Sequence, residues 1–378
     1  MKSLLANSGH AGPQRDFSDG TSLAKESLIV RISTLLAVAG ARVFRKATPV
    51  AVGFELTHLC NLACAYCDRH TPLPHEMSLE QILEALDGLF ALGMREISLD
   101  GGEPLTHREV GTIVDWLTER KVVVRMNTNG ILVRRRASVV EKLSKVKISL
   151  DGPPAVHDSA RGVRAFGRAL DGAQAARELG VAVEFTCVVG RHNAHSIDEL
   201  LGIVEHCGIP IIFQPARDSL FVGEKGPGQD YRLEGADIVR AFSRIEEHKR
   251  RGANVLNRWA SLRHFRNFPR DTPIPCAAGW INVTMDPEGY LHHCGQVRRT
   301  RSHSVVELGV AEAFARLSRT GCGQCWCARV VEENYAWGGR FDYSLPAAEQ
   351  NLPDEDLPSS PRGALIAAGS LVRRAGRR

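Results

Sequence analysis

The sequence lacks the features that would place it in a membrane, outside the cell or on nucleic acid. Its longest charge-free apolar run near the start, residues 32–41, is too short to cross a bilayer. Residues 1–20 are polar and contain no hydrophobic segment typical of a signal peptide. A net charge of +5 with no basic stripe interleaved with aromatics does not indicate nucleic acid as a partner. We therefore expect a cytoplasmic protein.

Cysteine, by contrast, is abundant and clustered. In a reducing compartment, grouped cysteines among the ten of this chain indicate metal ligands. The segment ELTHLCNLACAYCDRH (55–70) places Cys60, Cys64 and Cys67 at C-x3-C-x2-C spacing. A structural zinc or a closed iron–sulfur cluster usually takes four protein ligands, so three thiolates leave one position open for chemistry. A zinc site completed by His58 or His70 is the alternative.

The middle of the chain alternates between strands and helices. Period-2 apolar patterns predict six strands, at 51–57, 96–100, 121–127, 146–151, 181–189 and 209–215. Helical patterns separate them, and Ser78 with Gln81 predicts a capping box at the start of one helix. This alternation predicts a parallel sheet covered by helices, open or barrel-like.

Polar side chains gather near the carboxyl ends of these strands. Successive residues of a strand point to opposite faces, so Arg125 shares a face with Asn127, Ser149 with Asp151, and Gln214 with Ile212. The carboxyl ends of parallel strands carry the active sites of α/β sheets and barrels. We expect these residues to line a binding site.

Together with the three-cysteine loop, the motifs DGGEPL (100–105), TNG (128–130), SLDG (149–152) and Arg161-Gly162 resemble the signature set of the radical SAM superfamily. The resemblance implies a partial (β/α)6 TIM-like barrel, with Cys60, Cys64 and Cys67 holding a [4Fe–4S] cluster whose open iron binds S-adenosylmethionine. Reductive cleavage would then yield a 5′-deoxyadenosyl radical. The residues that the resemblance places near S-adenosylmethionine are Tyr66 against the adenine, Gly101, Gly102 and Glu103 at the amino group, Asn127 or Asn129, Ser149 and Asp151 at the ribose, Arg161 at the carboxylate, and Gln214 on the same lining.

A second cysteine group follows near the C-terminus. Cys276-x12-Gly289-x4-Cys294 precedes Cys322-x2-Cys325, and WINVTM and YLHHC flank a turn, which predicts a hairpin. This arrangement resembles the twitch form of the SPASM extension, which implies one auxiliary [4Fe–4S] cluster. Cys327 is either an alternative to Cys325 as ligand or a free thiol. A four-cysteine zinc ribbon is the competing interpretation.

These patterns divide the chain into six segments. They are a disordered N-terminus (1–21), an amphipathic helix (22–50), the core barrel (51–232), a helical connection (233–270), a small twitch-like cluster domain (271–345), and a Pro- and Ser-rich linker with a basic apolar tail (346–378).

Two residues of the fifth predicted strand are candidates for catalysis. Some radical SAM epimerases use a cysteine as hydrogen-atom donor, which draws attention to Cys187. Alternation, however, places Cys187 with Phe185 and Val189 on the apolar face, and a free buried cysteine is common. Glu184 lies on the opposite face and is the better candidate for a group inside the barrel.

The substrate is the least determined feature. About 50 residues precede the first strand, too few for the domain with which peptide-modifying relatives grip a leader peptide. We therefore expect a small metabolite, sugar-bearing or lipid-linked, with oxidation or epimerisation as the outcome and a flavodoxin- or ferredoxin-type reductant as partner. The alternatives are a ribosomal-peptide maturase, a non-catalytic electron-transfer protein with two clusters, and a zinc-binding module. The two basic, apolar terminal segments admit a peripheral membrane contact.

Overall fold

The computed structural model describes residues 28–70, 73–217, 226–270, 272–274, 276–296, 303–317 and 325–338. The predicted disordered N-terminus, the linker and tail beyond residue 345, and Cys322 lie outside these residues. In the part of the chain that is described, no helix is long and apolar enough to cross a membrane.

An eight-stranded sheet organises the fold, in the order β6-β5-β4-β3-β2-β1-β7-β8. Its strands are β1 (Ala51–Thr57), β2 (Glu96–Gly101), β3 (Val123–Thr128), β4 (Lys145–Ser149), β5 (Ala182–Val189), β6 (Ile211–Pro215), β7 (Asn282–Met285) and β8 (Leu291–His292). Neighbours from β6 through β1 to β7 pair in parallel, and only β7 and β8 are antiparallel. The six strands predicted from the sequence are all present, with ends displaced by at most two residues.

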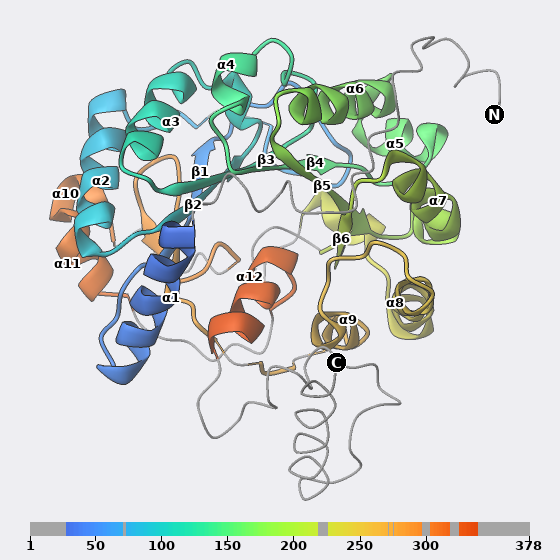
Figure 1. Cartoon of the computed structure of the whole chain (residues 1–378). Helices are drawn as coiled ribbons and strands as arrows, with labels where there is room; N and C mark the ends of the chain where they lie inside the picture. Colours follow the sequence, from blue (N-terminus) through green and yellow to red (C-terminus); the bar gives the residue numbers. More distant parts are fainter. Residues whose placement is uncertain are drawn as a thin grey trace, which may run out of the picture.

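Helices cover the outer face of this curved sheet (Figure 1). The longer ones are α2 (Leu79–Leu92), α3 (Val110–Glu119), α6 (Ala165–Glu178), α7 (Ile197–Cys207) and α8 (Gly235–Arg250), and the shorter ones are α4 (Ala137–Val140), α5 (Pro154–Arg161), α9 (Trp259–Phe265), α10 (Val305–Leu308) and α11 (Val310–Ala315). Helix α12 (Ala328–Glu333) lies on the inner side of the sheet instead (Figure 1). Helix α2 begins with the predicted capping box, in which Ser78 and Gln81 each bond the other's backbone N–H. The result is the partial (β/α)6 TIM-like barrel that the sequence predicted.

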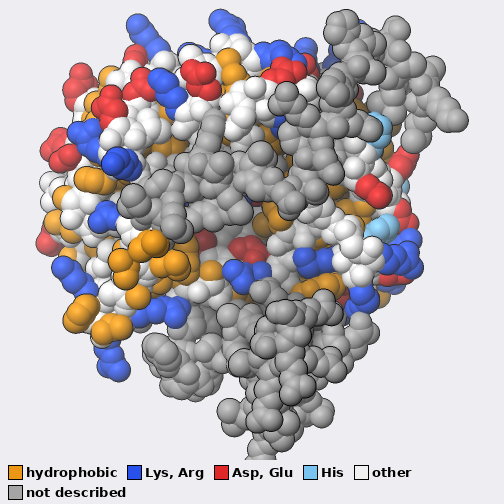
Figure 2. All heavy atoms as spheres, viewed as in Figure 1, with side chains coloured by type: hydrophobic (Ala, Val, Ile, Leu, Met, Phe, Trp, Pro, Cys, Tyr) orange, Lys and Arg blue, Asp and Glu red, His pale blue; other side chains and the backbone are white. Residues whose placement is uncertain are grey.

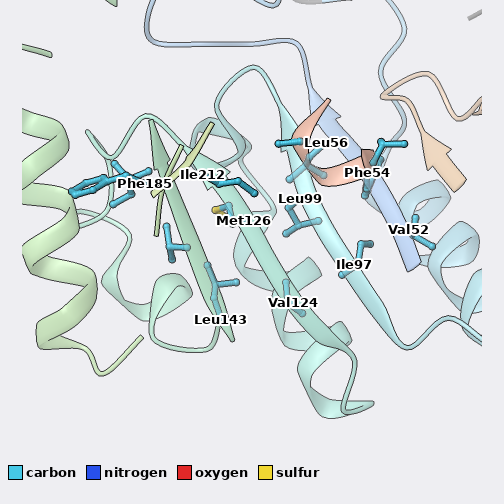
Figure 3. Close-up of a cluster of buried hydrophobic side chains, with 14 of the residues drawn as sticks. Val52, Phe54, Leu56, Ile97, Leu99, Val124, Met126, Leu143, Phe185 and Ile212 are labelled. Atoms are coloured by element: carbon cyan, nitrogen blue, oxygen red, sulfur yellow. The ribbon is translucent and has the colours of Figure 1, made fainter. Parts of the chain in front are cut away.

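The main hydrophobic core lies between the sheet and these outer helices. Every second strand residue contributes to it, as Figure 3 shows for Val52, Phe54, Ile97, Leu99 and Val124, which lie beside one another across neighbouring strands. The alternate residues of the same strands point to the inner side, where the polar groups gather. The period-2 pattern of the sequence therefore determines which side chains can reach a ligand.

The C-terminal hairpin continues the barrel sheet instead of standing apart from it. Strand β7 pairs with β1 from Ala51↔Asn282 to Phe54↔Met285. The backbone N–H groups of Glu288 and Tyr290 both donate to the Asp286 carboxylate at 3.0 Å, which stabilises the predicted turn. The segment that carries the second cysteine group is thus anchored directly to the strand that precedes the first.

Helix α1 (Leu28–Val43) packs at the edge of this arrangement. Val38 and Ala41 contact Val50, Ala277 and Ile281 in a second, small hydrophobic core. Within the segment predicted as one amphipathic helix, 22–50, the described helix runs from Leu28 to Val43 and buries one of its faces against the barrel.

Candidate active site at the carboxyl ends of the strands

The three predicted ligands lie together on the loop that follows β1. Cys60, Cys64 and Cys67 are half-buried, and all three line one cavity. The Cys67 N–H donates to the Cys64 carbonyl at 3.0 Å, which folds the loop into a turn. Burial raises the pKa of the Cys60 thiol to about 11 and also raises the pKa values of Cys64 and Cys67. Thiols of this kind become good ligands when a metal centre displaces their protons.

Two glycines allow the loop after β2 to press against the cysteine loop. At Gly101 a Cβ would lie 2.3 Å from the Thr57 carbonyl oxygen, and φ is +116°. At Gly102 a Cβ would lie 2.5 Å from the Leu59 carbonyl oxygen. Both glycines also line the cavity. The Gly-Gly pair is therefore required for the contact between two backbone segments, and it leaves their peptide groups beside the cavity.

Glu103 occupies a different place from its two neighbours. Its side chain is completely buried and does not line the cavity. The carboxylate accepts hydrogen bonds from the backbone N–H groups of Leu105 and Asn129 and from the Thr128 hydroxyl, at 2.8–3.1 Å. Burial raises its pKa to about 7. The Glu103 side chain thus connects the ends of β2 and β3 and does not point toward a ligand.

Asp151 is the centre of a buried network behind the cysteine loop. Its carboxylate accepts from Arg161 Nε at 2.6 Å, from the Tyr66 hydroxyl at 2.5 Å and from the Val188 N–H at 3.0 Å. Burial by itself would raise its pKa, but the Arg161 guanidinium more than offsets burial, and the pKa is lowered to about 2. Asp151 is therefore a permanent carboxylate with no exposed surface.

Arg161 connects this network to the cysteine loop. Its Nη1 lies 3.9 Å from the Cys64 sulfur, and its guanidinium lies 5.5 Å from the centre of the Tyr66 ring. The Ala65 N–H also donates to the Ala160 carbonyl at 2.8 Å, one residue before Arg161. The loop is thus held from behind by a cation, an aromatic ring and a backbone hydrogen bond.

One cavity of about 290 Å³ collects the remaining polar groups. Asn127, Asn129, Ser149 and Gln214 line it, as predicted, together with Tyr66 and Arg161. All seven parallel strands contribute a residue near their carboxyl ends: Glu55, Asp100, Asn127, Ser149, Val188, Gln214 and Thr284. The structure therefore brings the sequence-predicted set together, except for Glu103 and Asp151, which support it from behind.

The second cysteine group approaches the same cavity from the C-terminal side. The Gln296 amide nitrogen lies 4.0 Å from the sulfurs of both Cys294 and Cys325. Burial, together with the nearby Cys276 and Cys327, raises the pKa of Cys294 to about 12. Of the four described cysteines, Cys327 lines the cavity that also holds Cys60, Cys64 and Cys67.

Helix α12 begins directly after Cys327 and lies on the inner side of the sheet (Figure 1). The Gln214 side chain at the end of β6 accepts a hydrogen bond from the Ala328 N–H at 2.9 Å. At the next residue, Arg329 pairs with Glu333, one turn further along, at 3.1 Å and approaches Asp100 at 4.0 Å. Arg329 lies over Gly53, where a Cβ would be 2.5 Å from Nη2. Gln214 therefore acts at least in part as an anchor for α12.

The two catalytic candidates on β5 do not reach the cavity. Glu184 forms ion pairs with Lys145 at 2.9 Å and Lys147 at 3.1 Å, and its side chain is buried beneath them. Cys187 is 1% exposed and belongs to the main hydrophobic core. The structure thus places Cys187 on the apolar face that alternation indicated, and it places Glu184 on the opposite face, outside the cavity lining but paired with Lys147, which does line it.

Neither histidine of the zinc alternative faces the three cysteines. The His58 Nε2 atom lies 2.6 Å from Arg69 and 3.3 Å from Glu55. His70 is exposed, and its Nδ1 lies 3.2 Å from the Cys67 carbonyl. Three thiols beside an open, glycine-bounded cavity instead fit a [4Fe–4S] cluster with one free iron.

Several residues of the site carry no sequence signal that would have revealed them. Asn61 accepts from the Asn129 amide at 2.7 Å, and Asn193 donates to the Asp151 carbonyl at 2.7 Å. Gln296 and Arg329 become functional candidates only because the hairpin and α12 fold over the barrel. Their proximity to Cys294 and Cys327 in the sequence was the one available hint.

Comparison with known proteins agrees with this geometry. The sequence model of the radical SAM superfamily matches residues 54–203 of this chain. The mycofactocin maturase MftC of Mycobacterium ulcerans is 31% identical over 263 residues, which cover 65% of this chain and 68% of that protein. The chain belongs to the radical SAM superfamily, whose members use a [4Fe–4S] cluster and S-adenosylmethionine.

Two further proteins are similar to this chain, one in sequence and one in fold. The subtilosin biosynthesis protein AlbA of Bacillus subtilis is 28% identical over 256 residues, 65% of this chain and 55% of its own length. The crystal structure of Streptococcus suis SuiB bound to S-adenosylmethionine shares the fold at a TM-score of 0.53 and 17% identity, covering 69% of this chain and 64% of SuiB. The chain therefore spans about half to two thirds of the lengths of these relatives.

Proposed function

We propose that this chain is a radical SAM enzyme that modifies a peptide and holds one auxiliary iron–sulfur cluster in its C-terminal region. The observation that carries the proposal is the single cavity lined both by Cys60, Cys64 and Cys67 and by Cys327. A substrate between the two cysteine groups would be within reach of both.

The peptide replaces the small metabolite that the sequence led us to expect. Relatives named for peptide products, AlbA and the mycofactocin maturases, support this choice. A further structure shows SuiB bound to its precursor peptide SuiA. The short segment before β1 was the argument against a peptide, and it carries less weight than these similarities. We also propose that the net outcome is oxidation or epimerisation of the peptide.

The chain's own residues would hold the cofactors in place. When bound, the cluster and S-adenosylmethionine supply an electron and a radical that removes a hydrogen atom from an unactivated C–H bond. Cys60, Cys64 and Cys67 would ligate the cluster, and the peptide groups of Gly101 and Gly102 would meet the amino group of S-adenosylmethionine. The buried Asp151 and Arg161 would keep the cysteine loop and Tyr66 in one position, which limits side reactions.

The auxiliary cluster would take Cys276, Cys294 and cysteines of the segment 322–327. The donor set fits, because buried and half-buried thiols converge here and side-chain amides lie close to sulfur: Asn334 Nδ2 lies 3.4 Å from the Cys325 sulfur. Hydrogen bonds to ligand sulfurs are a usual way to tune such a cluster. A flavodoxin- or ferredoxin-type protein would supply the electrons.

The first test is anaerobic reconstitution of the whole chain. We expect about eight irons per chain and the formation of 5′-deoxyadenosine from S-adenosylmethionine and dithionite. Bound zinc without iron would contradict the proposal. Two clusters without 5′-deoxyadenosine would indicate an electron-transfer protein instead.

The second test addresses the substrate. Short peptides encoded beside the gene and a panel of nucleotide-linked sugars would be compared as activators of 5′-deoxyadenosine formation. We expect a peptide to increase the rate and to change in mass. Stimulation by a sugar alone would restore the small-metabolite interpretation.

A further inference from the structure

Helix α1 has two apolar faces, and the described residues bury only one of them. Val38 and Ala41 pack on the barrel in the small second core. On the other side, Leu35 and Leu36 are 64% and 66% exposed, and Ile32, Val43 and Phe44 are exposed as well. The spacing of residues 32, 35, 36 and 43 places them along one side of the helix. We call these five residues the α1 stripe.

Positive charge lies at the C-terminal end of the α1 stripe. Arg45 and Lys46 follow the helix and are exposed, and Arg42 lies in its last turn. The sequence contains no acidic residue between Glu26 and Glu55. Figure 2 shows hydrophobic and basic side chains side by side on the part of the surface where Figure 1 draws α1.

The charge disfavours two of the possible occupants of this surface. The C-terminal tail, residues 362–378, contains five arginines and no acidic residue, so it would be repelled by Arg45 and Lys46. A second copy of α1 would bring the same positive charges face to face. An apolar stripe with a cationic border instead complements a surface that is apolar inside and negative at its edge.

We propose that the α1 stripe binds an anionic lipid surface, with α1 lying in the plane of the headgroups. Leu35 and Leu36 enter the acyl boundary, while Arg45 and Lys46 contact lipid phosphates. The barrel stays in water, because it packs on the opposite face of α1, the face that points away from the membrane. Binding through the α1 stripe does not depend on the chemistry of the cavity.

The test is co-sedimentation of the reconstituted full chain with lipid vesicles. We expect binding to vesicles made of equal parts phosphatidylglycerol and phosphatidylcholine, little binding to phosphatidylcholine alone, and weakening by salt. The double variant Leu35→Glu/Leu36→Glu should lower the partition coefficient at least about tenfold. Arg45→Glu/Lys46→Glu should also lower it, by roughly tenfold or more.

A matched control distinguishes an effect specific to the α1 stripe from a general effect of replacing an exposed apolar residue by glutamate. Val239 on α8 is 43% exposed, so Val239→Glu makes the same kind of change on a different element and should leave vesicle binding unchanged. Thermal unfolding would verify that all variants remain folded. Failure of the unmodified chain to bind phosphatidylglycerol vesicles would overturn the proposal. So would a concentration-dependent dimer that the Leu35→Glu/Leu36→Glu change abolishes, since the occupant would then be a second copy.

Discussion

Replacing Asp151 by asparagine tests the buried network behind the cysteine loop. The change keeps the shape of the side chain and removes its charge. Arg161, which is 9% exposed, would then be a buried cation without its counter-ion. Breaking a buried pair in this way typically costs about 3–5 kcal/mol of stability. The pKa of Asp151 gives an independent figure: its drop from 3.8 to about 2 corresponds to roughly 2.5 kcal/mol.

The two figures together bracket the expected effect: Asp151→Asn should lower the free energy of unfolding by about 2.5–5 kcal/mol at pH 7. The pH dependence follows from the direction of the shift. A carboxylate whose folded pKa is lowered contributes its stability above its unfolded pKa, and the contribution is lost as the pH falls through the folded value. The gap between the two proteins should therefore be full at pH 7 and shrink as the pH approaches about 2.

Urea denaturation of the full chain, followed by tryptophan fluorescence at several pH values, measures this gap. Asp198 is the matched control, because its pKa is also lowered to about 2, by hydrogen bonds from Arg244, but its side chain is 55% exposed. Solvent screening limits such surface pairs, so Asp198→Asn should cost no more than about 1 kcal/mol. The double variant Asp151→Asn/Arg161→Gln should be more stable than Asp151→Asn alone, since it removes the unpaired cation. Equal losses at positions 151 and 198 would refute the reasoning.

Three further predictions concern the residues around the cavity and the two iron–sulfur clusters. Glu103→Gln should cost about 1–3 kcal/mol near pH 4.5, because an amide NH₂ would face a backbone N–H. The folded pKa of Glu103 is raised to about 7, so urea titrations should show this gap narrowing as the pH rises from about 4.5 to about 7 and staying constant above that. Gly101→Ala should destabilise the folded chain by more than about 1 kcal/mol, because φ is +116° and the new Cβ would meet backbone atoms. In Gly53→Ala the new Cβ would meet only the movable end of an arginine, so thermal unfolding should show a cost of less than about 1 kcal/mol. Cys294→Ala should lose about half of the iron after reconstitution, and Cys187→Ala, a core change, should lose none in the same iron assay.

The sequence predicted the barrel well because alternation and capping are local signals. Strand β1 has the predicted ends, and the polar residues of β3, β4 and β6 reach the cavity as their period required. Helix α12 was missed because six residues after a cysteine cluster carry no periodic pattern. Its position depends on long-range contacts, such as the bond from Ala328 to Gln214.

The roles of single side chains were harder to predict than their positions. Glu103 and Asp151 belong to motifs that indicate cofactor contact, but the structure buries both behind the cavity. A motif in a sequence does not distinguish a residue that touches a ligand from one that holds its neighbour. The hydrogen-bond partners decide between these two roles, and they come from segments that are distant along the chain.

The pairing of β1 with β7 has a consequence for the synthesis of the chain. Strand β1 needs a neighbour on each side, and β7 begins about 225 residues after β1 ends. At roughly 5–20 residues per second, ribosomes would leave that edge of β1 unpaired for on the order of ten seconds or more. An apolar strand such as AVGFELT with an open edge is a template for aggregation. Overproduced chains should therefore aggregate before they ever bind iron, and slower synthesis or chaperone supply should increase the soluble yield.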